Sequence, residues 1–348
     1  MGSPVRCAVI GLGMGSVHAK GFAECPESRL VAVADLDPKR LEKYAGQLGK
    51  DHCYSDYQQM LKREKPDVVG VALPNFLHAP VTIEALRSGA HVLCEKPMAM
   101  NVKQARGMIA AAKKAKRLLG INLSYRFTPQ AKALKDVADG GALGKVYHAY
   151  TSWTRRDGFP GMGGWFGRKA MSGGGPLIDL GVHRLDMAMW LMGGPRPETV
   201  SGSAHYEIGV PRGKAQKKAY DVEDFACGFI RFDTGASLVF RISWGGHQAD
   251  PEEMCTVVMG TEGSLIHRNE GGGYNFVAEF HTERKGHKLS GKVLPGASAH
   301  GNAYSDFVKS VVHGAPFLAT AEDGLRVQQV LDGLYQSAEL GREVRVGR

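Results

Sequence analysis

The first 120 residues alternate short apolar segments with segments of helical pattern, and this alternation constrains the fold of the 348-residue chain more than any other feature. The apolar segments are 5–13, 29–35, 66–74, 90–97 and 117–124. Apolar strands separated by helices predict a parallel sheet covered on both faces. Because ligands bind such sheets at the carboxyl ends of the strands, we expect the chemistry to follow each strand.

A glycine turn follows the first strand, in the order Gly11-Leu12-Gly13-Met14-Gly15-Ser16. Glycines permit a tight turn and let a pyrophosphate approach backbone N–H groups at a helix N-terminus. The turn departs from the GxGxxG pattern, since Gly15 comes one position early and Ser16 stands in its place. Glycine-rich turns are common, so this motif is a weak signal alone, but it predicts dinucleotide contacts from Gly11, Gly13, Met14 and Gly15.

Asp35 follows the second strand, 24 residues after Gly11. This is close to the spacing at which a carboxylate accepts hydrogen bonds from the adenosine ribose hydroxyls. A carboxylate there repels a 2′-phosphate, so the sequence predicts NAD rather than NADP as cofactor. Lys39 and Arg40 lie near enough to weaken that preference, and the alternative is that Asp35 is only a turn residue.

Two later loops also follow predicted strands. "LPNFLHAP" holds Pro74, Asn75 and His78, and "CEKPM" holds Lys96. Asn75 and His78 either contact the cofactor or cap the next helix. Lys96 is either a functional ammonium or an exposed charge in a turn, and spacing alone does not separate these interpretations.

The segment "SGGGPLIDLGVHRLD" places Asp179 and His183 four residues apart. Pro176 suits a first helical turn, and residues four apart on a helix are neighbours on one face. The spacing predicts that the carboxylate and the imidazole lie within reach of each other. The alternative is that His183 is a core imidazole with its hydrogen bonds satisfied inside the protein.

Composition narrows the function classes. The net charge is +9, but the basic residues are spread out and mixed with acids, so we expect no nucleic-acid partner and an anionic small ligand instead. The six cysteines show no metal or disulfide spacing, so we expect buried free thiols and no metal. No apolar run reaches the roughly 20 residues of a membrane span. The N-terminus lacks signal-peptide features, so we expect a cytoplasmic protein with no membrane partner.

Taken together, several segments resemble the Gfo/Idh/MocA oxidoreductases. They are "VIGLGMGSVHAKGF", "ADLDPKR", "LPNFLHAPVTIEALRSGAHVLCEKPMAMN", "NLSYRFTP" and "GGGPLIDLGVHRLDMAMWLMG". The resemblance covers nearly the whole chain and implies an α/β protein with an N-terminal Rossmann domain and a following α+β domain with a large open, mostly antiparallel sheet. Strand-like segments in the second half agree with this fold. We expect domain boundaries at 1–124 and 125–348, the second domain binding substrate and supporting oligomerisation.

The resemblance also implies roles for individual residues. Hydride transfer from a secondary alcohol needs a base at the hydroxyl, and an unperturbed imidazole, here that of His183, titrates near neutrality. Asp179 would steady the imidazole, and Lys96 would stabilise charge on the reacting oxygen. Glu95 and Pro97 belong to the same cofactor-binding tripeptide, and the Lys96–Pro97 peptide is expected to be cis.

Residues 153–175 form a segment rich in glycine, aromatic and cationic residues, which is typical of a functional loop. The segment predicts a substrate site for a sugar, glycoside or cyclic polyol. Its aromatic rings would stack on a sugar and its charged groups would bind hydroxyls, or they pack the sheet and face water. The candidate residues, including two that follow the last Rossmann strand, are Tyr125, Arg126, Trp153, Arg155, Arg156, Asp157 and Trp165, beside Asp179 and His183.

The predicted function is an NAD-dependent dehydrogenase of sugars, glycosides or inositols. One alternative is a glycosidase or epimerase-like enzyme that oxidises its substrate transiently, with Tyr304 or His300 as an extra base. A second alternative is a non-catalytic sensor on the same fold. The open sheet and the family resemblance further predict a homodimer or homotetramer.

Overall fold

The structure, a computed structural model, describes residues 3–296 and 301–347. Residue contacts divide the chain into two compact units, one of Met1–Leu123 with Gly301–Leu325 and one of Ser124–His300 with Arg326–Arg348. The sequence predicts one boundary, at 124/125, with everything after it in the second domain. The structure corrects this expectation, because Gly301–Leu325 returns to the first unit.

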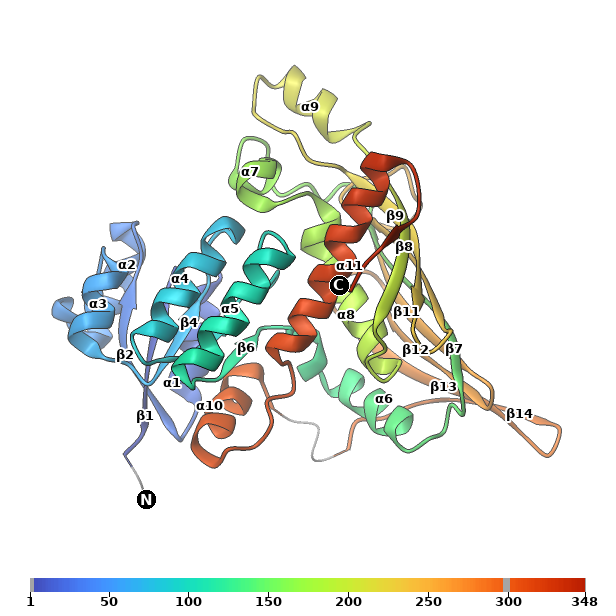
Figure 1. Cartoon of the computed structure of the whole chain (residues 1–348), viewed down its shortest axis with the longest axis horizontal. Helices are drawn as coiled ribbons and strands as arrows, with labels where there is room; N and C mark the ends of the chain where they lie inside the picture. The colour runs from blue at the N-terminus through green and yellow to red at the C-terminus, as the bar shows by residue number, and fades with distance from the viewer. Residues whose placement is uncertain (1–2, 297–300, 348) are drawn as a thin grey trace. The chain divides into compact units, whose positions relative to one another are not determined.

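The first unit is built on a parallel sheet with the strand order β3-β2-β1-β4-β5-β6 (Figure 1). Its strands are β1 (Val5–Ile10), β2 (Ser28–Ala34), β3 (Cys53–Tyr54), β4 (Val68–Val71), β5 (His91–Cys94) and β6 (Leu119–Ile121). The strand order reverses between β1 and β4, which is the switch point at which such sheets bind ligands. The predicted parallel α/β sheet is confirmed.

Helices connect these strands. They are α1 (Gly15–Glu24), α2 (Pro38–Leu48), η1 (Lys50–His52), α3 (Tyr57–Glu64), α4 (Asn75–Arg87) and α5 (Val102–Ala115). Local sequence fixes their starts. The Asp37 side chain accepts a hydrogen bond from Lys39 N with Pro38 in the first turn, and the Asn101 side chain accepts one from Gln104 N.

The returning segment contributes α10 (Ala303–His313) and the start of α11 (Ala321–Leu340) to the first unit. The ring of Tyr304 fills the space that a side chain at Gly21 would need, and Phe317 packs at Gly120 in the same way. Gly120 also forms a backbone bridge with Thr320. Packing of these apolar rings explains why a segment so far along the chain joins the first unit.

The second unit is built on a sheet with the order β14-β13-β12-β11-β7-β10-β9-β8-β15, antiparallel except for the pair β7–β10. Its strands are β7 (Val146–Arg155), β8 (Pro197–His205), β9 (Phe225–Phe232), β10 (Ser237–Ser243), β11 (Glu252–Gly260), β12 (Gly263–Asn269), β13 (Phe276–Arg284), β14 (His287–Lys292) and β15 (Val344–Arg345). The expected large, mostly antiparallel sheet is confirmed.

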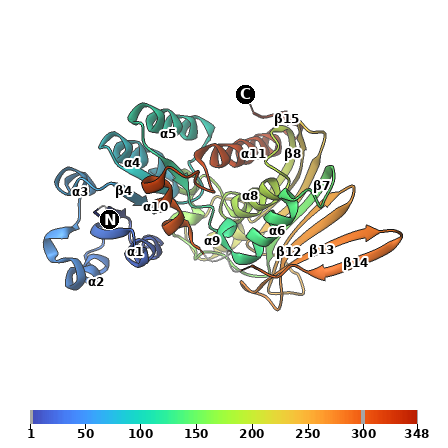
Figure 2. The same cartoon turned by 90° about the horizontal axis from the view of Figure 1, so that it is seen from below.

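Helices α6 and α8 of the second unit lie against one face of this sheet, as Figures 1 and 2 show. The helical segments of the second unit are η2 (Ser124–Phe127), α6 (Pro129–Asp139), η3 (Trp165–Gly167), α7 (Lys169–Ser172), η4 (Leu177–Gly181), α8 (Val182–Leu191), α9 (Gly209–Ala215) and the part of α11 from Arg326 onward. Every residue of α8 is buried. Polar side chains on a helix that is buried on all sides must find hydrogen-bond partners inside the protein. The partners of the polar residues on α8 therefore indicate what each residue does.

The opposite face of the sheet carries a row of apolar side chains in register. The row runs through Phe229, Val239, Tyr150, Val257 and Ile266. Val239 is 36% exposed and the other members are half-buried. Within the residues that the structure describes, no helix has the length and apolar character needed to cross a membrane.

Candidate active site

The glycine turn after β1 is shaped by close backbone contacts. Gly11 has φ +86°, and a Cβ there would lie 2.3 Å from the carbonyl oxygen of Ala72. A Cβ on Gly15 would lie 2.9 Å from Val9 Cγ1. Gly15 therefore allows α1 to approach β1 closely, the packing role of the third glycine in the usual fingerprint, although it comes one position early.

The start of α1 fits an anionic ligand. In the described chain, neither a side-chain cap nor an acidic residue in the first turn competes for its N-terminus. Gly13 is exposed, and Met14 is 65% exposed. A helix N-terminus attracts negative charge through its dipole and its backbone N–H groups. These residues fit the pyrophosphate of a dinucleotide.

Asp35 lies beside this turn and is held by the backbone. Its carboxylate accepts hydrogen bonds from Leu12 N at 2.6 Å and from Asp37 N at 2.8 Å. Arg40 Nη1 donates to the same carboxylate at 3.3 Å. Arg40 is about half exposed and also lies near Gly13. The structure thus places a carboxylate and a guanidinium together at the end of β2.

The loops after β4 and β5 are joined by His78. Its Nδ1 lies 2.7 Å from Pro97 O, and its Nε2 lies 2.7 Å from Leu73 O. Burial lowers the pKa of His78, and the two carbonyl contacts oppose this effect. His78 is 1% exposed, so it supports the two loops from inside. Asn75 is also buried, and Pro74 is the N-cap of α4.

The Lys96–Pro97 peptide is cis, which confirms the expectation. Lys96 is half-buried, while Glu95 before it is buried. Glu95 Oε1 lies 2.8 Å from His18 Nε2 and accepts a hydrogen bond from Asn122 Nδ2 at 2.6 Å. Burial alone would raise the pKa of Glu95, but His18, Asn122 and the charge of Lys96 outweigh it and lower the pKa to about 2.

In the second unit, Asp179 lies on η4, a π-helical turn that leads directly into α8. Single π turns of this kind occur frequently at functional sites. Asp179 Oδ2 accepts a hydrogen bond from Trp244 Nε1 at 3.1 Å. The expected helix is present, and Asp179 and His183 lie four residues apart along it.

A buried carboxylate caps the start of this helix. Glu223 accepts hydrogen bonds from Gly175 N at 2.9 Å, Leu177 N at 3.1 Å and the Tyr335 hydroxyl at 2.8 Å. Burial raises the pKa of Glu223, and these hydrogen bonds oppose that rise. Glu223 comes from a loop far along the chain, and only the tertiary structure identifies it as the cap.

Aromatic rings surround His183, which is 8% exposed. Its ring centroid lies 4.8 Å from that of Tyr125 and 5.9 Å from that of Trp153. Phe276 lies 5.6 Å from Tyr125. Tyr125 and Trp153, two predicted substrate residues, therefore lie at the predicted base.

Trp153 is only 2% exposed, so most of its ring packs the sheet. Its Nε1 donates to Glu252 Oε1 at 2.7 Å, and Arg155 Nε donates to the same oxygen at 2.6 Å. Arg155 Nη2 also lies 3.4 Å from the hydroxyl of Tyr274, which is 63% exposed. Glu252 and Tyr274 were not predicted. The β7–β11 pairing that places Glu252 opposite Arg155 and the fold of the segment before β13 that brings Tyr274 there are not visible in the sequence.

The loop after β7 is anchored within the second unit. Arg156 Nε donates to Gln248 O at 2.9 Å, and Arg212 Nη1 donates to Asp157 Oδ1 at 2.7 Å. Trp165 stacks on Phe166 at 3.8 Å, and Phe166 contacts Trp244, the partner of Asp179. Trp165 is thus linked to the candidate site through two rings.

Arg126 differs from the expectation. It is 3% exposed, and its Nε and Nη2 donate to the Asp186 carboxylate at 2.6–3.1 Å. Its guanidinium also lies 5.4 Å from the ring centre of Trp190. A fork-like ion pair buried in this way holds η2 on α8. The structure thus shows Arg126 packed between η2 and α8, and its predicted contact with substrate stays a prediction.

Arg184, the neighbour of His183, was not predicted either. It is fully buried, and its guanidinium lies 5.0 Å from the ring centre of Tyr125, 5.5 Å from Trp153 and 5.6 Å from Phe276. Burial lowers the pKa of Arg184, and Tyr125 opposes this effect. The sequence around Arg184 gives no indication that its guanidinium packs against these three aromatic rings.

Tyr304 does not fit the role of an extra base. It is 8% exposed, its hydroxyl accepts a hydrogen bond from Asn122 Nδ2 at 3.3 Å, and burial raises its pKa. His300, the other residue considered, lies outside the described residues. Within the described chain, no group of three or more His, Cys, Asp or Glu side chains is arranged to hold a metal.

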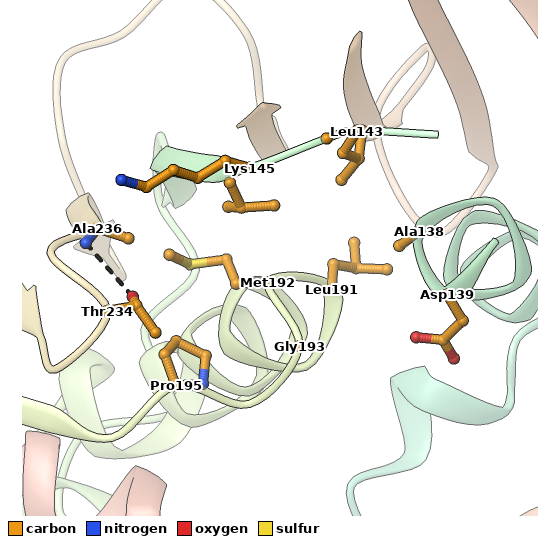
Figure 3. A pocket seen from close by; sticks show the side chains of 12 residues that line it. Ala138, Asp139, Leu143, Lys145, Leu191, Met192, Gly193, Pro195, Thr234 and Ala236 are labelled. Carbon is orange, nitrogen blue, oxygen red and sulfur yellow. Dashed lines mark hydrogen bonds between the residues drawn. The ribbon is translucent and has the colours of Figure 1, made fainter. Parts of the chain in front are cut away.

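A cavity of about 320 Å³ lies elsewhere in the second unit, between the ends of α6 and α8 and the turn after β9. Figure 3 shows Lys145 and Asp139 on different sides of it and the apolar side chains of Leu191 and Met192 between them. The cavity contains none of the predicted site residues. The cavity is therefore separate from the candidate site residues described above.

These features define a class of protein. One unit is a dinucleotide-binding Rossmann fold, and the other is a large open sheet with a packed helical segment that bears Asp179 and His183. Comparison with known families agrees. Residues 5–123 match the oxidoreductase family with an NAD-binding Rossmann fold, and residues 131–266 match the GFO/IDH/MocA C-terminal domain. The chain belongs to the Gfo/Idh/MocA family of oxidoreductases.

Relatives cover nearly the whole chain. It is 33% identical to the D-glucoside 3-dehydrogenase of Escherichia coli (strain K12), covering 99% of this chain and 98% of that protein. It is 27% identical to the myo-inositol 2-dehydrogenase of Thermotoga maritima, covering 98% of each. The crystal structure of aldose-aldose oxidoreductase from Caulobacter crescentus, complexed with glycerol, is 28% identical with a TM-score of 0.83, covering 98% of this chain and 99% of that one.

Proposed function

We propose that this oxidoreductase transfers hydride between NAD and a secondary hydroxyl of a glycoside, sugar or cyclic polyol. The observation that carries the proposal is the surrounding of Asp179 and His183 in the second unit. Trp244 holds Asp179, while Tyr125 and Trp153 flank His183. An acid and an imidazole beside aromatic rings suit a substrate that has hydroxyl groups and apolar ring faces.

The first unit would hold the cofactor. Gly11, Gly13, Met14 and Gly15 would face the pyrophosphate, and Asp35 would accept hydrogen bonds from the adenosine ribose. When bound, the nicotinamide supplies the hydride acceptor or donor. Pro74, Asn75, Glu95 and Pro97 would shape its surroundings, and His78 would act by bracing the loops. NAD is the preferred cofactor in this proposal because the Asp35 carboxylate repels a 2′-phosphate.

The chain's own residues would manage the proton and the charge. His183 takes the hydroxyl proton during oxidation and returns it during reduction. Asp179 orients the imidazole and bonds the same region of the substrate. The Lys96 ammonium donates a hydrogen bond to the reacting oxygen and stabilises the charge that develops on it.

Substrate recognition would use charged and aromatic groups at the end of β7 and just before β13. Arg155, Asp157 and Tyr274 offer hydrogen bonds to hydroxyl groups. The names of the Escherichia coli and Thermotoga maritima relatives, a glucoside and an inositol dehydrogenase, support a ring-shaped polyhydroxy substrate. A glycoside is the first substrate to test, because the glucoside enzyme is the more similar of these two.

The test is a substrate screen with purified protein. Methyl glucosides, free aldoses and inositols are each incubated with NAD and, in parallel, with NADP, and reduced nicotinamide is followed by absorbance. We expect reduction of NAD with at least one glycoside or cyclic polyol. Absence of turnover with every compound in both directions, from protein shown to bind NAD, would contradict the proposal.

We further propose that the chain assembles into a homodimer or homotetramer through the open face of the second sheet. The register row Phe229, Val239, Tyr150, Val257 and Ile266 leaves an apolar stripe on that face. Exposed apolar patches on soluble proteins commonly mark partner surfaces. The cytoplasmic location expected from the sequence stays a prediction.

A further inference from the structure

A polar cluster is buried in the first unit next to the Lys96 loop. It consists of His18 on α1, Glu95 after β5, Asn122 after β6 and Tyr304 on α10. His18 is fully buried and the other three are at most 9% exposed. Four elements distant in sequence thus place one polar side chain each at the carboxyl ends of β5 and β6.

Hydrogen bonds connect the four residues to the backbone of Lys96. His18 and Asn122 both contact Glu95 Oε1, and Asn122 also donates to the Tyr304 hydroxyl. The other carboxylate oxygen, Oε2, accepts a hydrogen bond from Lys96 N at 3.2 Å. One carboxylate therefore joins the buried cluster to the peptide that carries the Lys96 side chain.

Two glycines make room for the cluster. A Cβ on Gly70 would lie 2.8 Å from His18 Nδ1, and a Cβ on Gly21 would lie 2.1 Å from the Tyr304 ring. The rings of His18 and Tyr304 pack edge to face at 4.9 Å. The site for these two rings is consequently built into the backbone of α1 and β4.

Stability alone is a poor explanation for this cluster. Burying a hydrogen-bonded carboxylate costs desolvation energy, and apolar residues of similar size commonly stabilise a fold as well or better. A network of hydrogen bonds does, however, fix the direction of the groups that it holds. The residue directly attached to this network is Lys96, whose backbone N–H donates to Glu95.

We propose that His18, Asn122 and Tyr304 are positioning residues that act through Glu95 to fix the Lys96 ammonium for hydride transfer. The proposal rests on the catalytic role of Lys96 proposed above. It also gives the return of Gly301–Leu325 to the first unit a functional consequence, because this segment supplies Tyr304.

The test compares His18→Leu and Tyr304→Phe with the conservative variant His18→Gln, whose amide can still donate to Glu95. We expect His18→Leu to lower kcat by roughly tenfold or more, since small misplacements of catalytic groups cost up to about 10²-fold. Tyr304→Phe should lower kcat less, and His18→Gln should restore most of the activity. The Kd for NAD should stay unchanged in all three variants.

A second measurement uses the protein without cofactor or substrate. The rate at which acetic anhydride acylates Lys96 is measured by mass spectrometry, with Lys309 on α10 as the internal reference. We expect His18→Leu to change the Lys96 rate severalfold and His18→Gln to leave it near the original value. The matched control is His313→Gln, because His313 on α10 lies 2.6 Å from Glu27 in an exposed pair just before β2.

Outcomes separate the two proposals. Unchanged kcat and unchanged Lys96 acylation in His18→Leu, with or without a lower melting temperature, would overturn the positioning role. A lower kcat with unchanged Lys96 acylation would also overturn it, because the effect would not pass through Lys96. If the unmodified protein oxidises no substrate, the proposed function fails, while the acylation rates still test the link from His18 to Lys96.

Discussion

At the scale of single residues, the cofactor site contains two opposing groups. The proposed role of Asp35 is to bind ribose hydroxyls, whereas Arg40 donates to that carboxylate and is exposed enough to meet a phosphate. An arginine at this position is the usual means of accepting a 2′-phosphate. We therefore expect the choice between NAD and NADP to depend on whether the Asp35 carboxylate keeps Arg40 hydrogen-bonded.

Replacing Asp35 should test this balance. In Asp35→Ser, we expect NAD binding to weaken and NADP binding to strengthen, because Arg40 keeps only one of its two anionic partners, Asp37, and the Asp35 carboxylate no longer repels the phosphate. Fluorescence titration with both cofactors measures the change. Asp35→Ser combined with Arg40→Ala should lose the gain for NADP. An unmodified protein that binds NADP as tightly as NAD would contradict the assigned role of Asp35.

A second residue-scale prediction concerns the chemistry. Lys96→Ala and His183→Ala should each lower kcat by about 10² to 10⁴. The two losses should not multiply in the double variant, because both groups act on one oxygen in one transition state. Cofactor affinity, measured by titration, should persist in both. Near-normal turnover in His183→Ala would assign His183 to packing alone.

At the scale of elements, the η4–α8 segment depends on a cap from elsewhere in the second unit. Glu223 accepts hydrogen bonds from two backbone N–H groups at the start of this segment and from the Tyr335 hydroxyl. A Cβ on Gly174 would lie 1.9 Å from that hydroxyl, so the glycine run before Pro176 lets Tyr335 approach. The cap fixes where the helix begins and hence where Asp179 and His183 lie.

Removing the Tyr335 hydroxyl should weaken this cap. We expect Tyr335→Phe to lower the free energy of unfolding by about 1.5–3 kcal/mol, the range for a hydrogen bond to a charged group. Urea unfolding measures the loss. Tyr206→Phe, at a tyrosine that is 39% exposed in the same unit, serves as the control. Equal stability of Tyr335→Phe and the unmodified protein would contradict the capping role.

The same carboxylate predicts a pH dependence. Because burial raises the pKa of Glu223 in the folded protein, the unfolded chain loses its proton first as pH rises. Its contribution to the free energy of unfolding should therefore decrease as pH rises from the ordinary glutamate range to the raised value. Urea unfolding at several pH values should show a smaller decrease in Glu223→Gln. An identical pH profile in the variant would contradict this assignment.

At the scale of the whole molecule, the open face of the second sheet is the surface that an assembly would cover. Helices α6 and α8 lie on the other face (Figure 2). Leu238 and Phe240 point to the covered face and are buried, while Val239 between them is exposed. Alternation along β10 thus creates both the core and the apolar row.

A charge in the middle of that row should block assembly. We expect Val239→Lys to reduce the mass measured by light scattering from that of an oligomer to that of a monomer. Val312→Lys is the matched control, because Val312 is 46% exposed on α10 in the first unit. A monomeric mass for the unmodified protein at micromolar concentration would contradict the assembly proposal.

The sequence by itself determined the features that depend on neighbours along the chain. Alternating strands and helices predicted the parallel sheet, and the glycine turn and Asp35 fell at the ends of adjacent strands. The four-residue spacing of Asp179 and His183 predicted that both lie along one continuous helical segment. These features follow from local periodicity and turn geometry, which are properties of short segments.

Tertiary structure alone decided which distant side chains meet. Arg126 was expected at the substrate, yet Asp186 binds it inside the protein, and Glu252, Trp244 and Glu223 came to the site through strand pairing and loop packing. Tyr304 likewise reached Asn122 only because Gly301–Leu325 folds back on the first unit. Such contacts depend on strand register and on the packing of whole elements, and neither can be predicted from the sequence of a short segment.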